Sequence, residues 1–90
     1  MIFVIRARVR ERGEDDFTYM YAGSFFPNST SVGWYRNDKC AETFLNAGIA
    51  RKYFNKHQTK LLQNPEFSVA LDSIEICSVE YTSVERINIL

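Results

Sequence analysis

The hydrophobic pattern at the start of the chain has a period of two residues. Over positions 2–10 (IFVIRARVR) every odd position is apolar, whereas the even positions include Arg6, Arg8 and Arg10. Successive side chains of a β-strand point to opposite faces of a sheet. The pattern therefore predicts a strand with one buried side and one side that carries arginines.

A second strand is predicted over 17–26 (FTYMYAGSFF), and a polar turn near Gly13 and Glu14 closes a hairpin. In this register one face pairs Val9 with Thr18, Ala7 with Met20 and Ile5 with Ala22. The other face sets Arg10, Arg8 and Arg6 beside Phe17, Tyr19 and Tyr21, respectively. A slip of one residue would reverse the faces of the second strand, so the face that carries the tyrosines stays open.

The pattern changes to a helical period over 46–64 (NAGIARKYFNKHQTKLLQN). One largely apolar face is formed by Ala50, Tyr53, Phe54, His57 and Leu61. Asn46 is a favourable N-cap, and Pro65 disfavours helix at the residue before it. The spacing predicts the main helix of the chain.

The remaining segments predict shorter elements. We expect a short strand at 31–35, an edge strand or extended connection at 39–44, a helical turn at 65–67, and an edge strand or tail at 84–90. Residues 73–81 have apolar side chains on both faces, which is typical of a more central strand. The result is a single α+β domain over 1–90, in the order β-β-(β)-α-β, with an antiparallel sheet and one main helix packed on one face. One helix covers one side of a sheet, so the other side faces solvent or a partner.

Composition limits the functional classes. The 90 residues are 46% hydrophobic, and 11 basic residues balance 11 acidic ones. This balance disfavours an acidic nucleic-acid mimic and a wholly basic nucleic-acid coat, but it permits a local basic patch. Two cysteines, Cys40 and Cys77, cannot form a framework of several disulfides, and no apolar run approaches the roughly 18 residues of a membrane helix. We therefore expect a cytoplasmic protein without a membrane partner.

A loose motif runs through the middle of the chain, consisting of Trp34-Tyr35, then Ala41-Glu42-Thr43-Phe44, then Ala50 and Tyr53. It resembles the pattern of small phage-type ββαβ proteins, which have a hairpin, an aromatic turn, an A-x-x-F edge segment, one helix and a final strand in this order. The resemblance covers about half of the chain. Some proteins of this type bind and inhibit host or defence proteins. The resemblance therefore implies a binder, in the host cytoplasm if phage-encoded, and it assigns a role to no single residue.

The first candidate binding surface combines two strands and contains Arg6, Arg8, Arg10, Tyr19 and Tyr21. Guanidinium groups beside exposed rings stack on unpaired bases and neutralise phosphates in sheet-face RNA binders. Arginine and tyrosine are also enriched in protein interfaces. The alternative is a solvated face whose arginines pair with Glu75 or Glu80 on another strand.

A second basic surface is predicted on the helix, from Arg51, Lys52, Lys56 and Lys60. Lysines on a rigid element meet the requirement for phosphate contacts. Lysine-rich faces are also common on solvated helices, where they complement the helix dipole near the C-terminus. We expect this surface and the arginines of the first strand to lie on opposite sides of the sheet.

Trp34 and Tyr35 follow Gly33 in a segment flanked by loops. A tryptophan at such a place either covers the core or forms an exposed anchor, the type of residue that most often dominates binding energy. In the second case Trp34 and Tyr35 join the partner-binding residues.

The sequence gives little support for a catalytic site. His57, the only histidine, falls on the apolar helix face, where a packed histidine is more common than a general base. The spacing of Cys40 and Cys77 does not indicate a cysteine nucleophile beside His57. It also does not match the paired spacing of zinc ligands. We therefore expect no enzyme, no catalytic residue, no metal and no cofactor.

The leading hypothesis is a non-enzymatic interaction protein that binds a protein partner through the open side of the sheet and the Trp34 segment, as an inhibitor of a host or defence protein. The alternative is a nucleic-acid-binding module, for RNA, that uses the arginine-bearing face or the basic helix. A homodimer that serves a larger assembly is the third hypothesis.

Overall fold

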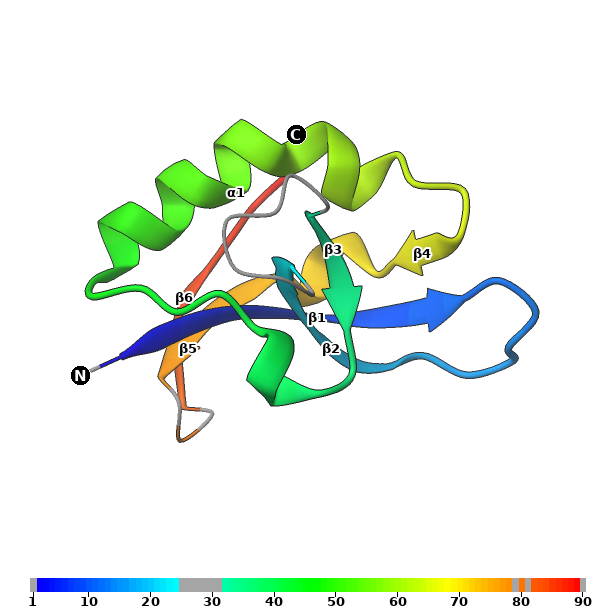
Figure 1. Ribbon diagram of the computed structural model, residues 1–90, viewed down its shortest axis with the longest axis horizontal. Helices are drawn as coiled ribbons and strands as arrows, with labels where there is room; N and C mark the ends of the chain where they lie inside the picture. Colours follow the sequence, from blue (N-terminus) through cyan, green and yellow to red (C-terminus); the bar gives the residue numbers. More distant parts are fainter. Residues whose placement is uncertain (1, 25–31, 79, 81, 90) are drawn as a thin grey trace.

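The computed structural model describes residues 2–24, 32–78, 80 and 82–89. Among these residues the chain forms a six-stranded antiparallel sheet and one α-helix. The elements are β1 (Phe3–Glu11), β2 (Thr18–Ser24), β3 (Val32–Tyr35), the 3₁₀ turn η1 (Asp38–Cys40), α1 (Ala47–Leu62), β4 (Phe67–Val69), the 3₁₀ turn η2 (Leu71–Ser73), β5 (Glu75–Ser78) and β6 (Ser83–Arg86). The helix lies across one face of the sheet (Figure 1), so the predicted α+β class is confirmed.

The sheet has the strand order β3-β2-β1-β5-β6, and β4 also pairs with β1. One edge of the long strand β1 pairs with β5 in its first half and with β4 in its second half. The position of β5 between β1 and β6 confirms the predicted central strand. The segment 65–67 forms only a single turn, closed by the Phe67 N–H and the Asn64 carbonyl at 3.1 Å, before the chain enters β4. It does not continue as a helix, because the next residues pair with the edge of β1 that faces away from β2.

The β1–β2 hairpin has the predicted register. The four observed pairs are Arg6 with Tyr21, Ala7 with Met20, Arg8 with Tyr19, and Val9 with Thr18. Gly13 in the turn has a φ of +89°, a conformation that costs glycine little because it has no Cβ. Of the two other predicted pairs, Arg10 with Phe17 lies beyond one end of this ladder and Ile5 with Ala22 lies beyond the other. There the Ala22 carbonyl instead accepts a hydrogen bond from the Glu42 N–H at 3.0 Å. Residues 25 and 26 of the predicted second strand and residue 31 of the strand predicted at 31–35 lie outside the described residues.

The extended connection before the helix packs against both strands of the hairpin. Phe44 exchanges two backbone hydrogen bonds with Phe3, of 2.8 and 2.9 Å. Gly23 of β2 forms a bridge with Ala41, and a Cβ at Gly23 would lie only 2.0 Å from the carbonyl oxygen of Cys40. The predicted extended segment is therefore present at 41–44, where it depends on a glycine in β2, but the prediction is wrong for Lys39 and Cys40, which belong to η1.

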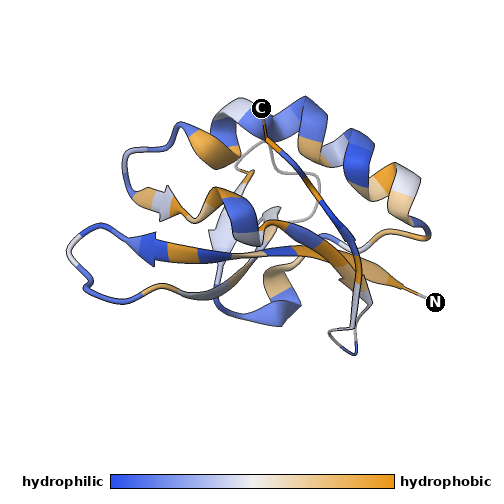
Figure 2. Ribbon diagram, turned by 180° about the vertical axis from the view of Figure 1, so that it is seen from behind, coloured by the Kyte–Doolittle hydropathy of each residue, from blue (hydrophilic) through white to orange (hydrophobic). Residues whose placement is uncertain are grey.

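The core lies between the sheet and α1. The alternating positions predicted to face inward are fully buried in β1, namely Ile5, Ala7 and Val9. Met20, Ala22 and Ile76 join them from the neighbouring strands, and the helix contributes Ala50, Phe54 and Leu61. The helix begins where expected, because the Asn46 side chain accepts the N–H of Ile49 at 2.9 Å. Its side turned away from the sheet is mostly hydrophilic (Figure 2).

Trp34 belongs to this core. Its side chain is 2% exposed, opposite Ala22 in the sheet. Its indole N–H donates to the carbonyl oxygen of Leu61 at 2.8 Å. The prediction of Trp34 as an exposed anchor for a partner is therefore wrong, and the alternative of a core residue is confirmed. The reason is that β3 pairs with β2 in a register that turns its even positions, including Val32, toward the helix.

Candidate binding face of the sheet

The side of the sheet opposite α1 carries the residues predicted for partner binding, apart from Trp34. We call it the arginine–tyrosine face, and it comprises Arg6, Arg8, Arg10, Tyr19, Tyr21 and Tyr35. The β1–β2 register sets Arg8 directly opposite Tyr19. The β2–β3 register places Tyr35 opposite Tyr21 on the same face. The arginines and tyrosines therefore share one face, which is the question that the sequence left open.

Arg6 is held by an acid from the next strand. Arg6 and Glu75 are paired in the β1–β5 ladder, and the Arg6 Nε lies 2.6 Å from Glu75 Oε1. The two side chains are only 16% and 10% exposed. Burial is the largest single effect on the pKa of Arg6 and lowers it, but the hydrogen bond that Arg6 donates to Glu75, together with the nearby Cys77, Glu75 and Tyr19, raises the pKa overall. The Arg6 side chain is thus largely engaged in this ion pair. This agrees with the alternative in which the arginines of this face pair with Glu75 or Glu80.

Two arginines of this face lie against aromatic rings. The Arg6 guanidinium carbon is 4.3 Å from the ring centre of Tyr19, and that of Arg10 is 5.3 Å from the ring centre of Phe17. Both distances fall within the range of cation–π attraction. Tyr19 nevertheless remains 49% exposed and Phe17 36% exposed. The face therefore presents aromatic rings to solvent beside fixed positive charges.

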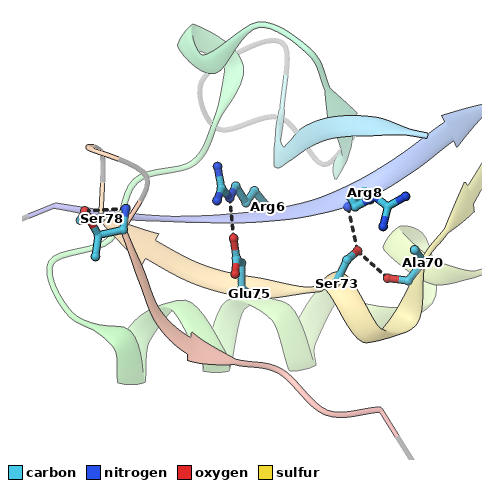
Figure 3. A network of polar contacts seen from close by, with 7 residues as sticks. Arg6, Arg8, Ala70, Ser73, Glu75 and Ser78 are labelled. Carbon is cyan, nitrogen blue, oxygen red and sulfur yellow. Dashed lines mark hydrogen bonds and ion pairs between the residues drawn. The ribbon is translucent and has the colours of Figure 1, made fainter. Parts of the chain in front are cut away.

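A pocket opens on this face where β1, η2, β5 and β6 meet. Its volume is about 170 Å³, and it is lined by Arg8, Tyr19, Asp72, Ser73, Glu75 and Arg86. The Ser73 hydroxyl accepts the backbone N–H of Arg8 at 2.8 Å and donates to the Ala70 carbonyl at 2.6 Å (Figure 3). Across the pocket, Arg86 Nη1 donates to the Asp72 carbonyl at 2.8 Å.

Sequence reasoning missed three of these lining residues. Asp72 and Ser73 lie in a short 3₁₀ turn with no periodic pattern, and Arg86 lies on an edge strand of four residues. The feature that locates these residues is the strand pairing, since Glu75 lies between Arg6 on one side and Arg86 on the other. The sequence alone does not show this pairing, because it depends on the order of the strands.

The basic helix surface lies on the opposite side of the molecule from the arginine–tyrosine face. Lys52, Lys56 and Lys60 are exposed on α1. Arg51 instead reaches Glu85 of β6, with Nε and Oε2 2.7 Å apart, and this hydrogen bond raises the pKa of Arg51. The two basic surfaces therefore do not form one groove.

His57 packs against an aromatic stack at the edge of the helix. Its ring centre is 4.6 Å from that of Tyr53, which is in turn 5.0 Å from that of Phe44. Burial lowers the pKa of His57, and Lys56 and Lys60 add to the effect. Burial raises the pKa of Tyr53 to about 12.

Cys77 lies on the face of β5 that points away from the helix, opposite Val4, and burial raises the pKa of its thiol. The sheet therefore separates Cys77 from His57. Within the described ranges no group of three or more histidine, cysteine or acidic side chains is placed to hold a metal ion. No helix in the described part of the chain has the length and apolar character needed to cross a membrane.

Comparison with protein-family models, curated proteins and solved structures found no match to this chain.

Proposed function

We propose that this chain is a non-enzymatic interaction domain that binds a protein partner through its arginine–tyrosine face. The observation that carries the proposal is the pair Arg8 and Tyr19, which lie directly opposite each other and are both exposed. Arginine and tyrosine most often supply the dominant contacts of protein interfaces, because they offer large contact area and several donors. Among the described residues the one α-helix, α1, covers the other side of the sheet.

The charge pattern favours a protein over a nucleic acid. Acids accompany the arginines on and beside the face, with Glu75 paired to Arg6 and Asp72 next to Arg86. Exposed arginines elsewhere are also paired, for example Arg36 with Glu14. A polyanion needs a continuous basic surface, whereas a folded protein surface accommodates mixed charges. The resemblance to small phage-type binders adds that the partner is a host or defence protein that this chain inhibits in the host cytoplasm.

The proposal is tested by comparing what immobilised variants retain from a host extract. Arg8→Glu and Tyr19→Ala alter the arginine–tyrosine face, and Lys56→Glu is the control because it changes a charge on the opposite side. We expect the wild type and Lys56→Glu to retain the same protein and the two face variants to lose it. The proposal would be contradicted if Lys56→Glu lost the protein while both face variants still retained it.

RNA is the second candidate, favoured by the Arg6 guanidinium stacked on the exposed ring of Tyr19. Single-stranded RNA binders combine such rings with a basic groove. The test is binding of mixed-sequence single-stranded RNA at low and then physiological salt. Binding that persists at physiological salt and falls with Arg8→Glu supports RNA, and absence of binding at low salt removes this candidate.

A further inference from the structure

We propose that the pocket between Arg8 and Arg86 is a carboxylate-binding site that receives an acidic side chain of the protein partner. The inference rests on the proposed function and names the chemical group that the partner would insert. Arg8 comes from the middle of β1 and Arg86 from the end of β6, and both line the same pocket of about 170 Å³.

The backbone of the pocket is fixed by hydrogen bonds that leave donors available. Ser73 holds the Arg8 main chain, so the position from which the Arg8 side chain extends is set. No ion pair of Arg8 is formed within the described part of the chain. Arg86 donates one N–H to the Asp72 carbonyl. A guanidinium has five N–H donors in a planar fork, so Arg86 retains donors for a ligand.

The net charge around the pocket suits a single negative charge. In the lining itself, Arg8 and Arg86 stand against Asp72 and Glu75, and Arg6, which lies beside the pocket and pairs with Glu75, brings the local balance to one positive charge in excess. One oxygen of Glu75, Oε1, is engaged with Arg6. A phosphate dianion would bring a second negative charge toward Asp72 and Glu75, whereas a carboxylate carries one charge and matches the arginine fork in two parallel hydrogen bonds.

The size of the pocket agrees with this ligand. Because one water occupies about 30 Å³ in the liquid, the volume corresponds to roughly six waters. The end of an aspartate or glutamate side chain fits this space, and the exposed Tyr19 ring at the rim can cover its methylene groups.

The inference is tested by NMR titration of the full chain with an acetylated, amidated peptide of alternating glycine and glutamate. The same peptide with glutamine is the uncharged control, and inorganic phosphate and oligouridine are competing ligands. We expect saturable shifts of the Arg8 and Arg86 Nε–H signals with the glutamate peptide only. Arg86→Gln and Arg8→Gln should each weaken binding about tenfold, since each removes charge-assisted hydrogen bonds. Arg12→Gln, which alters a 73% exposed side chain outside the pocket, should leave binding unchanged.

Equal shifts with the glutamine peptide, equal shifts at Arg12, or tighter binding of phosphate or oligouridine at the same residues would overturn the inference. The proposed function is judged separately. If the glutamate peptide causes no NMR shifts but Tyr19→Ala still loses the partner protein, the carboxylate site is refuted and the proposed function is not. A pocket that binds the glutamate peptide, with partner retention unaffected by both face variants, supports the site and refutes the proposed function.

Discussion

The indole N–H of Trp34 in β3 donates to the backbone carbonyl oxygen of Leu61 near the end of α1, at 2.8 Å and out of contact with water. In a continuing helix this carbonyl would accept the N–H of residue 65, but that residue is proline and has none. Trp34 therefore supplies the donor that Pro65 lacks. The same bond ties the edge strand β3 to the helix.

Trp34→Phe should destabilise the fold by about 1–3 kcal/mol, because it keeps an aromatic ring but leaves the buried Leu61 carbonyl without a donor. Urea unfolding followed by circular dichroism measures the change. Tyr19→Phe, on an exposed ring, is the control and should have little effect. A Trp34→Phe variant as stable as the wild type would mean that the hydrogen bond contributes nothing.

Gly23→Ala should destabilise the protein by about 1–3 kcal/mol through overpacking, because the new methyl group would meet the Cys40 carbonyl oxygen at 2.0 Å and the Glu42 nitrogen at 2.8 Å. The matched control is Gly33→Ala in the neighbouring strand, whose methyl group would approach only side-chain atoms of Tyr35, at 4.0 Å. Thermal unfolding of both variants checks this prediction. Equal losses at the two positions would contradict it.

A double-mutant cycle on Arg6→Met and Glu75→Leu should give a coupling energy of about 1–3 kcal/mol, since this charged hydrogen bond is mostly shielded from water. The cycle on Arg12 and Glu66 provides the comparison within the same chain. Those atoms are 3.8 Å apart and the side chains are 73% and 63% exposed, so their coupling should be much weaker. Similar coupling in the two cycles would show that burial does not strengthen the Arg6 pair.

Stability should fall as the pH is lowered through the range in which histidine titrates. The pKa of His57 is lowered in the folded protein, so the unfolded chain binds this proton more readily. The contribution of neutral His57 is complete above the unfolded pKa near 6.5 and is lost as the pH falls toward the lower folded pKa. Unfolding free energies at pH 7.5 and about 5.5 should differ less in His57→Gln than in the wild type. An identical pH dependence in the two proteins would exclude His57 as the cause.

The hairpin and the faces of β1 follow from local patterning. Alternation in β1 specifies which of its side chains are buried and the polar turn at Gly13 indicates the hairpin, whereas the face of β2 that carries the tyrosines was decided by the observed register. The helix is predicted equally well, because its apolar spacing and its Asn46 cap are properties of neighbouring residues. These features needed no knowledge of distant contacts.

The pocket depends on distant contacts and could not be predicted. Arg8 and Ser73 are 65 positions apart in the sequence, and they meet because β4 and β5 pair with successive halves of β1. Short strands and 3₁₀ turns contain too few residues for a periodic signal. Their positions are set by which backbone edges remain unpaired.

The residue periodicity of this chain therefore predicts its local structure. The predicted features are a hairpin with arginines on one side, a capped helix and a sheet with one covered face. Tertiary packing decided the burial of Trp34, the partner of Arg6 and the set of residues around the pocket. Periodicity reports which side of an element is apolar, whereas the contact of two distant elements depends on strand order and on competition for unpaired hydrogen-bonding groups. Trp34 shows this most directly, because its buried indole N–H bonds to a helix carbonyl that is left without a backbone donor by a proline 31 positions further along the chain.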